Sequence, residues 1–514
     1  MRADYGRGIL KQMEEMEARM IEQIAQMEKK HAANVTKVEN HYEELLRKSN
    51  ERWEEKCEGY KKQAEESGNK VAELEEKVER LEEEIGRLKS KGKNNSGNSS
   101  LPPSTDEKPS RDKAANEYNG RKKSGKSSGG QTGHPGRTLR IDETEQRLRE
   151  KGIEIQVEHV GKPGKEHKKR LVLDLNTSVT ARELRFYPDK EGKYAIPSRY
   201  TGEVIYGDKI KALTVFLYGQ GVTSLERIEE MLVCLSGQAL RPSQGTISNW
   251  LKEFDRLSKP ELNRLEETLL DAPVVHTDST NVTTNGCQSY IRNFSTDEAV
   301  LYTAMPKRSH KALSEITFLK KYAGILIHDH ETALYKYGVE HGECNVHILR
   351  YLRKNTEDTE HIWSGEMAAF LVRLNSMRKE CILQGVRCFS PAQITDFEKQ
   401  YDDILNKAGQ ESIEKPCRFQ WASKAEQALL KRMQKYKANH LLFLHDFNVS
   451  FDNNMSERDL RKCKNRQKMS GGFRTQHGCS MYCGIMSVIE TCKRKAVSIF
   501  DSLLNIFAQK PALI

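Results

Sequence analysis

Three acidic residues, far apart in the sequence, have settings that could support phosphoryl transfer. Asp278 ends the run Val274–Asp278 and Asp329 ends the run Gly324–Asp329, so each is predicted to lie at the C-terminal end of a short buried strand. Carboxylates on neighbouring strand ends repel each other unless a cation lies between them, and hard divalent ions prefer oxygen ligands. The pattern predicts a site for two Mg²⁺ or Mn²⁺ ions, which needs a third carboxylate for in-line phosphoryl transfer.

Glu457 is the best candidate for the third carboxylate. It stands at a predicted helix start, and the stretch from Arg458 to Lys468 holds six basic residues against one acid. Such a helix favours a polyanionic partner. The residues predicted to contact DNA phosphates are Arg458, Arg461, Lys464, Arg466 and Lys468.

Each acid also has a purely structural alternative. Asp278 and Asp329 could be turn acids at strand ends, and Glu457 stands three residues after Asn454, the N3 position of a capping box. Arg461 could form an intrahelical ion pair with Glu457. The combination of the three acids in this order favours catalysis over the single structural interpretations.

The elements that must position these acids follow a recognisable order. Two strand-like runs, Ser289–Phe294 and Ala299–Ala304, are joined by a polar turn and predict a hairpin. A helical stretch, Ser314–Tyr322, then leads to the strand that ends at Asp329. Strand, hairpin, helix and strand is the order of an α/β RNase H-like core, which we expect over residues 271–480. The long interval before Glu457 has helical patterns and predicts a helical insertion at about 342–444, and residues 481–514 are expected to form a C-terminal helical segment.

A Cys-x2-His pair lies inside this insertion. Cys344 and His347 have metal-ligand spacing, but zinc would need two more ligands that the local sequence does not supply. We therefore expect a helix turn packed near the active site and no zinc. His276, His328 and His330 flank the acids, where they could assist catalysis, although packing or support of the metal ligands is the preferred interpretation.

Two segments before the predicted core could recognise DNA. Residues 206–270 have helical periodicity with the layout of a helix-turn-helix, in which Ser243 caps a second helix. Gln244, Thr246 and Asn249 would read the groove, unless the helix pair only packs against other helices. Residues 138–205 alternate short apolar and polar runs and predict a small β-rich DNA-binding unit.

The N-terminal part divides into a predicted coiled coil and a basic linker. Residues 1–90 contain no proline, and an apolar heptad seam predicts self-association into a homo-oligomer, with packing on the chain's own body as the alternative. Residues 91–137 read as a flexible linker; between Lys89 and Arg137 there are eleven Lys or Arg against four Asp or Glu. This charge could neutralise phosphates or simply be solvated. The seam residues are Val71, Leu74, Val78, Leu81, Ile85 and Leu88, and the linker residues predicted to contact DNA are Arg121, Lys122, Lys123 and Lys126.

Composition excludes several classes of protein. A chain of 514 residues predicts several domains, here a multidomain α+β protein. The eleven cysteines include no CxxC pair, which indicates thiols in a reducing compartment rather than a disulfide scaffold or zinc ribbon. The sequence has no run of about 20 apolar residues and no apolar leader, so we expect no membrane partner. The expected location is the bacterial cytoplasm, in association with the nucleoid.

These residues together resemble the insertion sequence 66 family of transposases, within the DDE class. The resemblance runs through the whole chain and depends on the shared order of several strings. They are Asn98–Asp106, Gly129–Gly136, the Asp278 strand, the Cys344/His347 turn, Asn453–Arg461, Phe473–Gly478 and Ser487–Lys493.

The resemblance implies a DNA transposase that binds terminal inverted repeats, cleaves DNA at the element ends and transfers the strands to target DNA. Asp278, Asp329 and Glu457 would be the catalytic residues and metal ligands. The family usually has a four-cysteine zinc module after the Gly129–Gly136 block, but this chain has no cysteine between Cys57 and Cys234. That module must be free of metal here. Ser279 also replaces the glutamate usual after the first acid.

The sequence is also compatible with two rival functions. A non-catalytic coiled-coil scaffold would use the same basic surfaces to bind DNA, with the acids acting only as caps. An RNase H-like nuclease would hydrolyse DNA without joining it.

Overall fold

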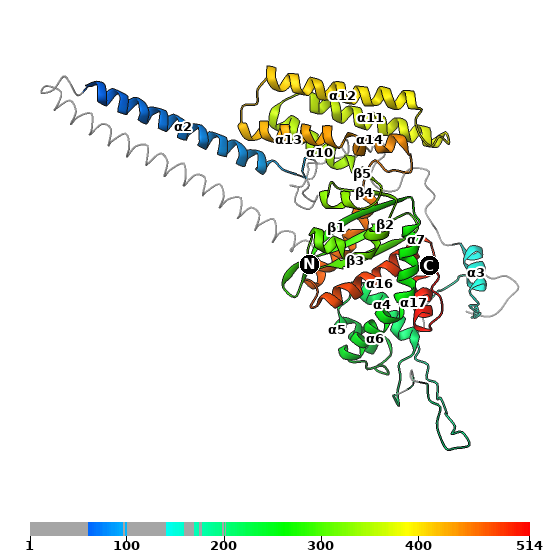
Figure 1. The fold of residues 1–514 in the computed structure, drawn as a ribbon. Helices are drawn as coiled ribbons and strands as arrows, with labels where there is room; N and C mark the ends of the chain where they lie inside the picture. The colour runs from blue at the N-terminus through cyan, green and yellow to red at the C-terminus, as the bar shows by residue number, and fades with distance from the viewer. Residues whose placement is uncertain are drawn as a thin grey trace. The chain divides into compact units, whose positions relative to one another are not determined.

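The computed structural model describes residues 60–95, 98–99, 140–158, 169–173, 177–197, 200 and 202–514 (Figure 1). The chain divides into a unit ending at Lys89 and a unit from Ser90 to Ile514. The predicted linker contacts Arg121, Lys122, Lys123 and Lys126 lie outside the described residues, as does the chain before Tyr60. Among the described helices, none has the length and apolar character to cross a membrane.

A single long helix, α2 (Tyr60–Gly92), forms the described part of the first unit. Its sequence is rich in Glu and Lys and has no proline, which suits a long exposed helix. The seam residues Leu74, Val78, Leu81, Ile85 and Leu88 are between 37% and 49% exposed. This apolar stripe is accessible to a partner helix, and the coiled coil itself stays a prediction.

A five-stranded sheet organises the second unit, with strand order β3-β2-β1-β4-β5. Strand β1 pairs antiparallel with β2, β2 pairs antiparallel with β3, and the pairs β1/β4 and β4/β5 are parallel. The predicted order of strand, hairpin, helix and strand is therefore present. The strands are β1 (Val274–Thr284), β2 (Cys287–Ser295), β3 (Val300–Met305), β4 (Ile325–His328) and β5 (Glu340–Glu343).

The sheet differs from the prediction in two respects. Strand β1 continues six residues beyond Asp278, so this acid lies inside the strand and not at its end. The reason is a second hairpin, β1–β2, which turns at Asn285 and Gly286; both have positive φ, as a tight two-residue hairpin requires. Strand β5 was not predicted, because its sequence Glu-His-Gly-Glu lacks the residues that usually favour strands.

Helices cover both faces of the sheet. On one face, β1, β2 and β3 are covered by α15 (Asn454–Ser470) and α16 (Gln476–Arg494). On the other face, the same strands enclose an apolar cluster with α7 (Lys259–Leu270), α8 (His310–Ser314) and α9 (Thr317–Lys321). Side chains alternate between faces along β1, so Val275 packs with α7, α8 and α9, and Val282 packs with α15 and α16. Asp278 shares the face of Val282, toward α15.

Between β5 and α15 the chain forms five helices with a core of their own, built around Trp363, Leu371, Tyr401 and Met433. They gather on the β5 side of the sheet, where α14 contacts β5 (Figure 1). Helical structure therefore fills the interval where the insertion was predicted. The helices are α10 (Asn345–Thr359), α11 (Trp363–Leu383), α12 (Pro391–Glu414), α13 (Gln420–Lys435) and α14 (Lys437–His445).

The segments before and after the core are mainly helical. Helices α4 (Asp208–Gly219), α5 (Leu225–Leu235), α6 (Gln244–Leu257) and α7 occupy the range predicted to be helical. At the other end, α16 crosses residue 480 and packs in the same apolar cluster as α17 (Ile499–Phe507). The boundary predicted at 480/481 therefore falls inside a core helix.

Residues 138–205 do not show the predicted β structure in their described part. This part contains α3 (Ile141–Glu150) and one isolated bridge between Pro188 and Tyr194. The apolar residues that suggested strands are exposed there, including Val157, Val172 and Tyr187. Among the described residues of this range, these alternating side chains have no partner strands and so no sheet face to fill.

Candidate active site

Asp278 lies beside Asp329 because of the parallel pairing of β1 and β4. The register pairs Val274 with Ile325 and His276 with Ile327. Continued by two residues, the same register places Asp278 opposite Asp329, directly after β4. The two acids thus meet across neighbouring parallel strands, although only Asp329 stands at a strand end.

The backbone around Asp278 is fixed by hydrogen bonds. The Asp278 N–H donates to Asn293 Oδ1 at 3.2 Å, and the Ser279 N–H donates to Asp278 Oδ1 at 2.6 Å. Burial, together with the negative charge of Asp329, raises the pKa of the Asp278 carboxyl to about 7, and the Glu457 charge adds to the effect. The carboxyl is therefore placed where a second carboxylate makes ionisation costly.

Asp329 has hydrogen-bonding and positively charged neighbours. His347 Nδ1 lies 3.4 Å from Asp329 Oδ1, and Asn453 Nδ2 lies 3.5 Å from the same oxygen. Burial favours the neutral acid, but His347 and Asn453 more than compensate and hold the pKa of Asp329 below its ordinary value. Asp329 is thus held as a carboxylate beside Asp278.

Glu457 enters the same region from the first turn of α15. Burial and the nearby Asp329 charge raise its pKa, while Arg350 and Arg461 oppose the effect. Its Oε1 atom is buried and has no hydrogen-bond partner within the described residues. The capping-box alternative is wrong, because α15 begins after Asn453 and no side chain caps it; Glu457 is therefore one residue too late for N3.

Asn453 connects the three elements that carry the acids. Its Oδ1 atom lies 3.0 Å from His276 Nδ1, and its Nδ2 atom donates to the carbonyl of Thr277 at 2.9 Å. The same amide nitrogen faces Asp329. Its N–H donates to Cys344 Sγ at 3.3 Å. The side chain that could have capped the helix instead joins β1 to the end of β4. Sequence reasoning missed this role, although Asn453 lies in the same Asp-Asn-Asn-Met-Ser-Glu string as Glu457.

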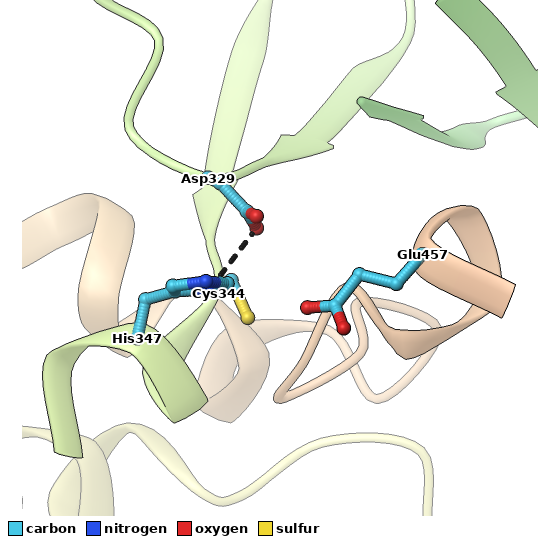
Figure 2. Close-up of side chains that lie close together, drawn as sticks. All are labelled: Asp329, Cys344, His347 and Glu457. Carbon is cyan, nitrogen blue, oxygen red and sulfur yellow. Dashed lines mark ion pairs between the residues drawn. The ribbon is translucent and has the colours of Figure 1, made fainter. Parts of the chain in front are cut away.

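The Cys344/His347 turn lies against the acids, as Figure 2 shows. One ligand atom from each of Asp329, Cys344, His347 and Glu457 lies within 4.8 Å of every other. The two further ligands that the local sequence lacked are thus available from distant segments. Asp278 is not one of these four residues. The negative charges of Asp329 and Glu457 nevertheless act on its carboxyl, because both raise its pKa.

A sequence model of the transposase IS66 family matches residues 203–481. This match covers more than half of the chain and includes all three acids. The chain belongs to the IS66 transposase family. No curated protein matches it. Membership indicates a DNA-processing enzyme with a role in transposition, and α2 and the described residues 140–200 lie outside the matched region.

The predicted groove-reading residues of this transposase lie on α6. Ser243 caps that helix as predicted, accepting a hydrogen bond from the Thr246 N–H at 3.2 Å. Gln244 and Asn249 are exposed, and Thr246 is half-buried with its hydroxyl 3.0 Å from Ser243 Oγ. The predicted surface is therefore present, and its contact with DNA stays a prediction.

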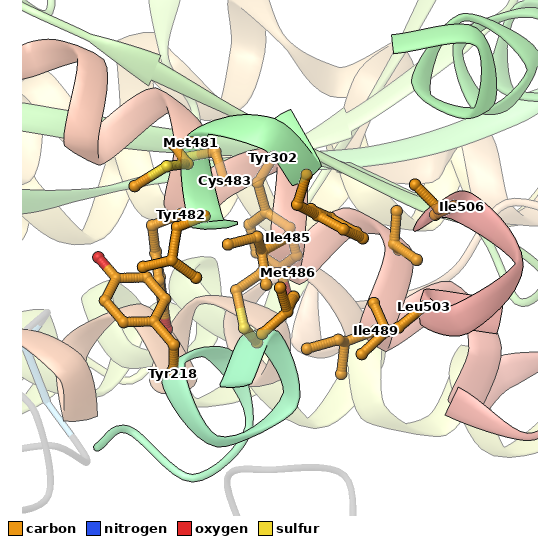
Figure 3. Close-up of a cluster of buried hydrophobic side chains, with 14 of the residues drawn as sticks. Tyr218, Tyr302, Met481, Tyr482, Cys483, Ile485, Met486, Ile489, Leu503 and Ile506 are labelled. Carbon is orange, nitrogen blue, oxygen red and sulfur yellow. The ribbon is translucent and has the colours of Figure 1, made fainter. Parts of the chain in front are cut away.

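The basic residues of α15 divide into two groups. Arg458, Arg461, Lys464 and Lys468 are exposed. Arg466 is buried, so the structure favours a packing role for it over the predicted contact with DNA. Its guanidinium lies 4.3 Å from the Tyr218 ring centroid and donates to the Tyr218 carbonyl at 3.3 Å. Figure 3 shows Tyr218 beside Tyr482 in the apolar cluster, so Arg466 connects α15 to α4.

Two features near the acids escaped the sequence analysis. Arg292 is fully buried on β2 and pairs with Glu331 at 2.5 Å, which places an ion pair close to Asp278. The flanking histidines have structural partners: His328 contacts His341 and His330 contacts Glu343. These pairings join residues from separate elements, so no local sequence pattern indicates them.

Proposed function

We propose that this chain is a DDE transposase that binds the terminal inverted repeats of its insertion sequence, cleaves DNA at the element ends and transfers the strands to target DNA. One observation carries the proposal: the parallel register of β1 and β4 brings Asp278 opposite Asp329, and Glu457 of α15 offers a ligand atom within 4.8 Å of one on Asp329. Burial, together with the charge of Asp329, raises the pKa of both Asp278 and Glu457. Buried carboxylates that repel each other in this way suit a catalytic site better than a structural one.

The three acids fit a pair of divalent cations. A cation would remove the repulsion between the carboxylates, and the buried Glu457 Oε1 has no partner in the described chain that would compete for it. We propose Asp278, Asp329 and Glu457 as the ligands of two Mg²⁺ or Mn²⁺ ions. Such ions activate the attacking oxygen and stabilise the leaving oxygen in phosphoryl transfer.

The chain's own residues would orient this chemistry. Asn453 fixes the end of β4 against the start of α15, so Asp329 and Glu457 keep a defined separation. The exposed side chains of Arg458, Arg461 and Lys464 follow Glu457 on the same helix and provide positive charge for the DNA backbone. Phosphate contacts of this kind position the DNA without reading its sequence.

Other parts of the chain would supply recognition and assembly. The exposed Gln244 and Asn249 on α6 are proposed to contact base edges of the terminal repeats, with Thr246 beside them. The basic segment 91–137 would add phosphate contacts, and the α2 stripe would join copies of the chain into a homo-oligomer.

The proposal is tested with purified full-length protein and labelled DNA that carries the element ends. In Mg²⁺ or Mn²⁺ we expect both cleavage and joined products. Asp278→Asn and Asp329→Asn are expected to keep DNA binding and to lose at least about 100-fold in cleavage rate, because each removes a metal ligand. Asp297→Asn, an exposed acid in the β2–β3 turn, is the matched control and should cleave as the unmodified protein does.

The rival functions give different results. Hydrolysis without any joined product would favour an RNase H-like nuclease. DNA binding without metal-dependent cleavage, unchanged by either Asn variant, would favour a scaffold and would refute the proposed catalytic role.

A further inference from the structure

We propose that the turn at Cys344 and His347 is a metal-independent clamp that sets the positions of Asp329 and Glu457. This inference rests on the proposed function, because the clamp acts on two of the proposed metal ligands. His347 is a positioning residue in this proposal, and it does not bind an ion itself. The alternative is a transition-metal site formed by all four clustered residues.

The clamp begins with backbone hydrogen bonds on both sides of the turn. The Cys344 N–H donates to the carbonyl of His328 at 3.1 Å, the residue before Asp329. The next N–H, of Asn345, donates to the carbonyl of Phe451 at 3.0 Å, just before α15. Two successive residues thus bind the end of β4 and the approach to α15. The turn fixes the two backbone segments that carry Asp329 and Glu457.

The Cys344 thiol adds a third connection. Cys344 is 1% exposed, and its sulfur accepts the hydrogen bond from the Asn453 N–H. Asn453 is the residue at which α15 begins, and its side chain reaches Asp329. A sulfur used in this way supports the start of the helix.

His347 contacts Arg350, and this contact favours a proton on Nδ1, the nitrogen that faces Asp329. Arg350 Nη1 lies 3.1 Å from His347 Nε2, and a guanidinium can only donate. In the neutral imidazole, Nε2 must accept this hydrogen bond, so the proton is on Nδ1. In the imidazolium both nitrogens carry protons. In either state Nδ1 has a proton and no lone pair for a metal.

Nδ1 faces Asp329 Oδ1 in an ion-pair contact at 3.4 Å and has no closer hydrogen-bond partner within the described residues. Hydrogen bonds in active sites without substrate are commonly long and shorten in the reactive complex. Removing a group that hydrogen-bonds to a metal-binding side chain typically lowers the metal affinity about 10- to 100-fold. The structure thus assigns to His347 the task of holding the Asp329 carboxylate.

Two conservative substitutions test this assignment. The side-chain amide of Asn is attached at the same distance from the backbone as Nδ1 of His, whereas the amide of Gln reaches the position of Nε2. We expect His347→Asn to keep the contact with Asp329 and His347→Gln to lose it. The Mg²⁺ concentration for half-maximal cleavage should rise roughly 10- to 100-fold in His347→Gln and less than about 3-fold in His347→Asn.

Further variants separate this effect from general damage. The rate at saturating Mg²⁺ should fall much less than the metal affinity in His347→Gln. His477→Gln, at an exposed position on α16, is the matched imidazole control and should change neither quantity. Equal behaviour of the Asn and Gln variants would overturn the positioning role.

Cobalt tests the alternative directly, with Co²⁺ alone as the probe. Thiolate ligation of Co²⁺ produces a charge-transfer absorption band in the near ultraviolet. We expect no such band from Cys344. Cys417→Ser controls for the second Cys/His/Glu group, His361–Cys417–Glu426, and Cys388→Ser controls for an exposed thiol. A band that survives both controls and disappears in Cys344→Ser would overturn the clamp and establish a metal site.

The proposed function can fail independently of the clamp. Full cleavage by Asp278→Asn would refute the catalytic triad, since Asp278 lies outside the four-residue cluster. Loss of cleavage in Asp278→Asn, together with identical metal dependence in the two His347 variants, would keep the triad and refute the clamp.

Discussion

The carboxyl group of Asp278 makes the stability of the metal-free protein depend on pH. Its pKa is about 7 in the folded chain, against an ordinary value of 3.8. Between these values the unfolded chain is ionised while the folded chain keeps the proton, so the free energy of unfolding falls as pH rises from about 4 to about 7. We expect Asp278→Asn to remove this dependence and, above pH 7, to exceed the unmodified protein by roughly 1–3 kcal/mol.

This prediction is measured by denaturant titration in the presence of a chelator, over a series of pH values. The difference in stability between the two proteins should vanish below about pH 4, where the Asp278 carboxyl is protonated in the folded and in the unfolded chain. The exposed Asp297→Asn variant should follow the unmodified curve at every pH. Parallel curves for Asp278→Asn and the unmodified protein would show that Asp278 titrates normally.

At the level of single residues, the sequence could identify chemical types but not partners. Asp278, Asp329 and Glu457 were recognisable because each lies at or near a pattern of strand or helix. The contacts of Asn453 and Arg350 could not be predicted, because they depend on which segments meet in three dimensions. Arg466 shows the opposite case, in which a basic residue in a basic helix lies buried against Tyr218 and Tyr482.

Strand β5 ends in a buried carboxylate that joins the sheet to the helical insertion. Glu343 is 1% exposed and binds partners from four elements or loops. Arg432 of α13 pairs with it at 2.7 Å and His440 of α14 lies at 3.2 Å. His330 and Tyr335 bind its other oxygen. These contacts hold the pKa of Glu343 well below its ordinary value, against the effect of burial.

Removing this carboxylate should destabilise the protein strongly. Glu343→Ala leaves the Arg432 charge and several polar groups without their partner, and we expect a loss of about 3–5 kcal/mol in the free energy of unfolding. Glu340→Ala, on the same strand but exposed, is the matched control and should change it by less than about 0.5 kcal/mol. Denaturant titration measures both. Equal stabilities would mean that the network contributes little.

At the level of elements, the order of the first four strands along the chain was predictable, and their lengths were not. The Asn285–Gly286 turn was a hairpin signal in the sequence that was not recognised, and it extends β1 beyond Asp278. Strand β5 was missed because it depends on its pairing with β4 and on the ion pair of Glu343 with Arg432 in the insertion rather than on local propensity. The β-rich prediction for 138–205 relied on alternation alone.

For the molecule as a whole, the exposed stripe on α2 predicts an oligomer that depends on this helix. Leu81→Glu combined with Ile85→Glu places charge on the stripe, and burying each of these apolar side chains would otherwise contribute roughly 1.5–3 kcal/mol. We expect the double variant of the full chain to behave as a monomer in light scattering coupled to size-exclusion chromatography.

The control substitutions lie on the outer surface of the same helix. Glu79→Gln combined with Arg87→Gln changes charge without touching the seam, and this variant should retain the oligomer. A monomeric unmodified chain would exclude self-association through α2. An oligomer that survives both double variants would place the interface elsewhere.

The five-helix insertion between β5 and α15 also determines when the three acids of the candidate site are all present during synthesis. The ribosome releases the strands carrying Asp278 and Asp329 first, and the helix carrying Glu457 emerges only after α10 to α14. The helices in between have their own core and can fold while translation continues. On the proposed function, a nascent or truncated product that lacks α15 would hold only two of the three acids, and the proposed cleavage site would become complete only when translation is nearly finished.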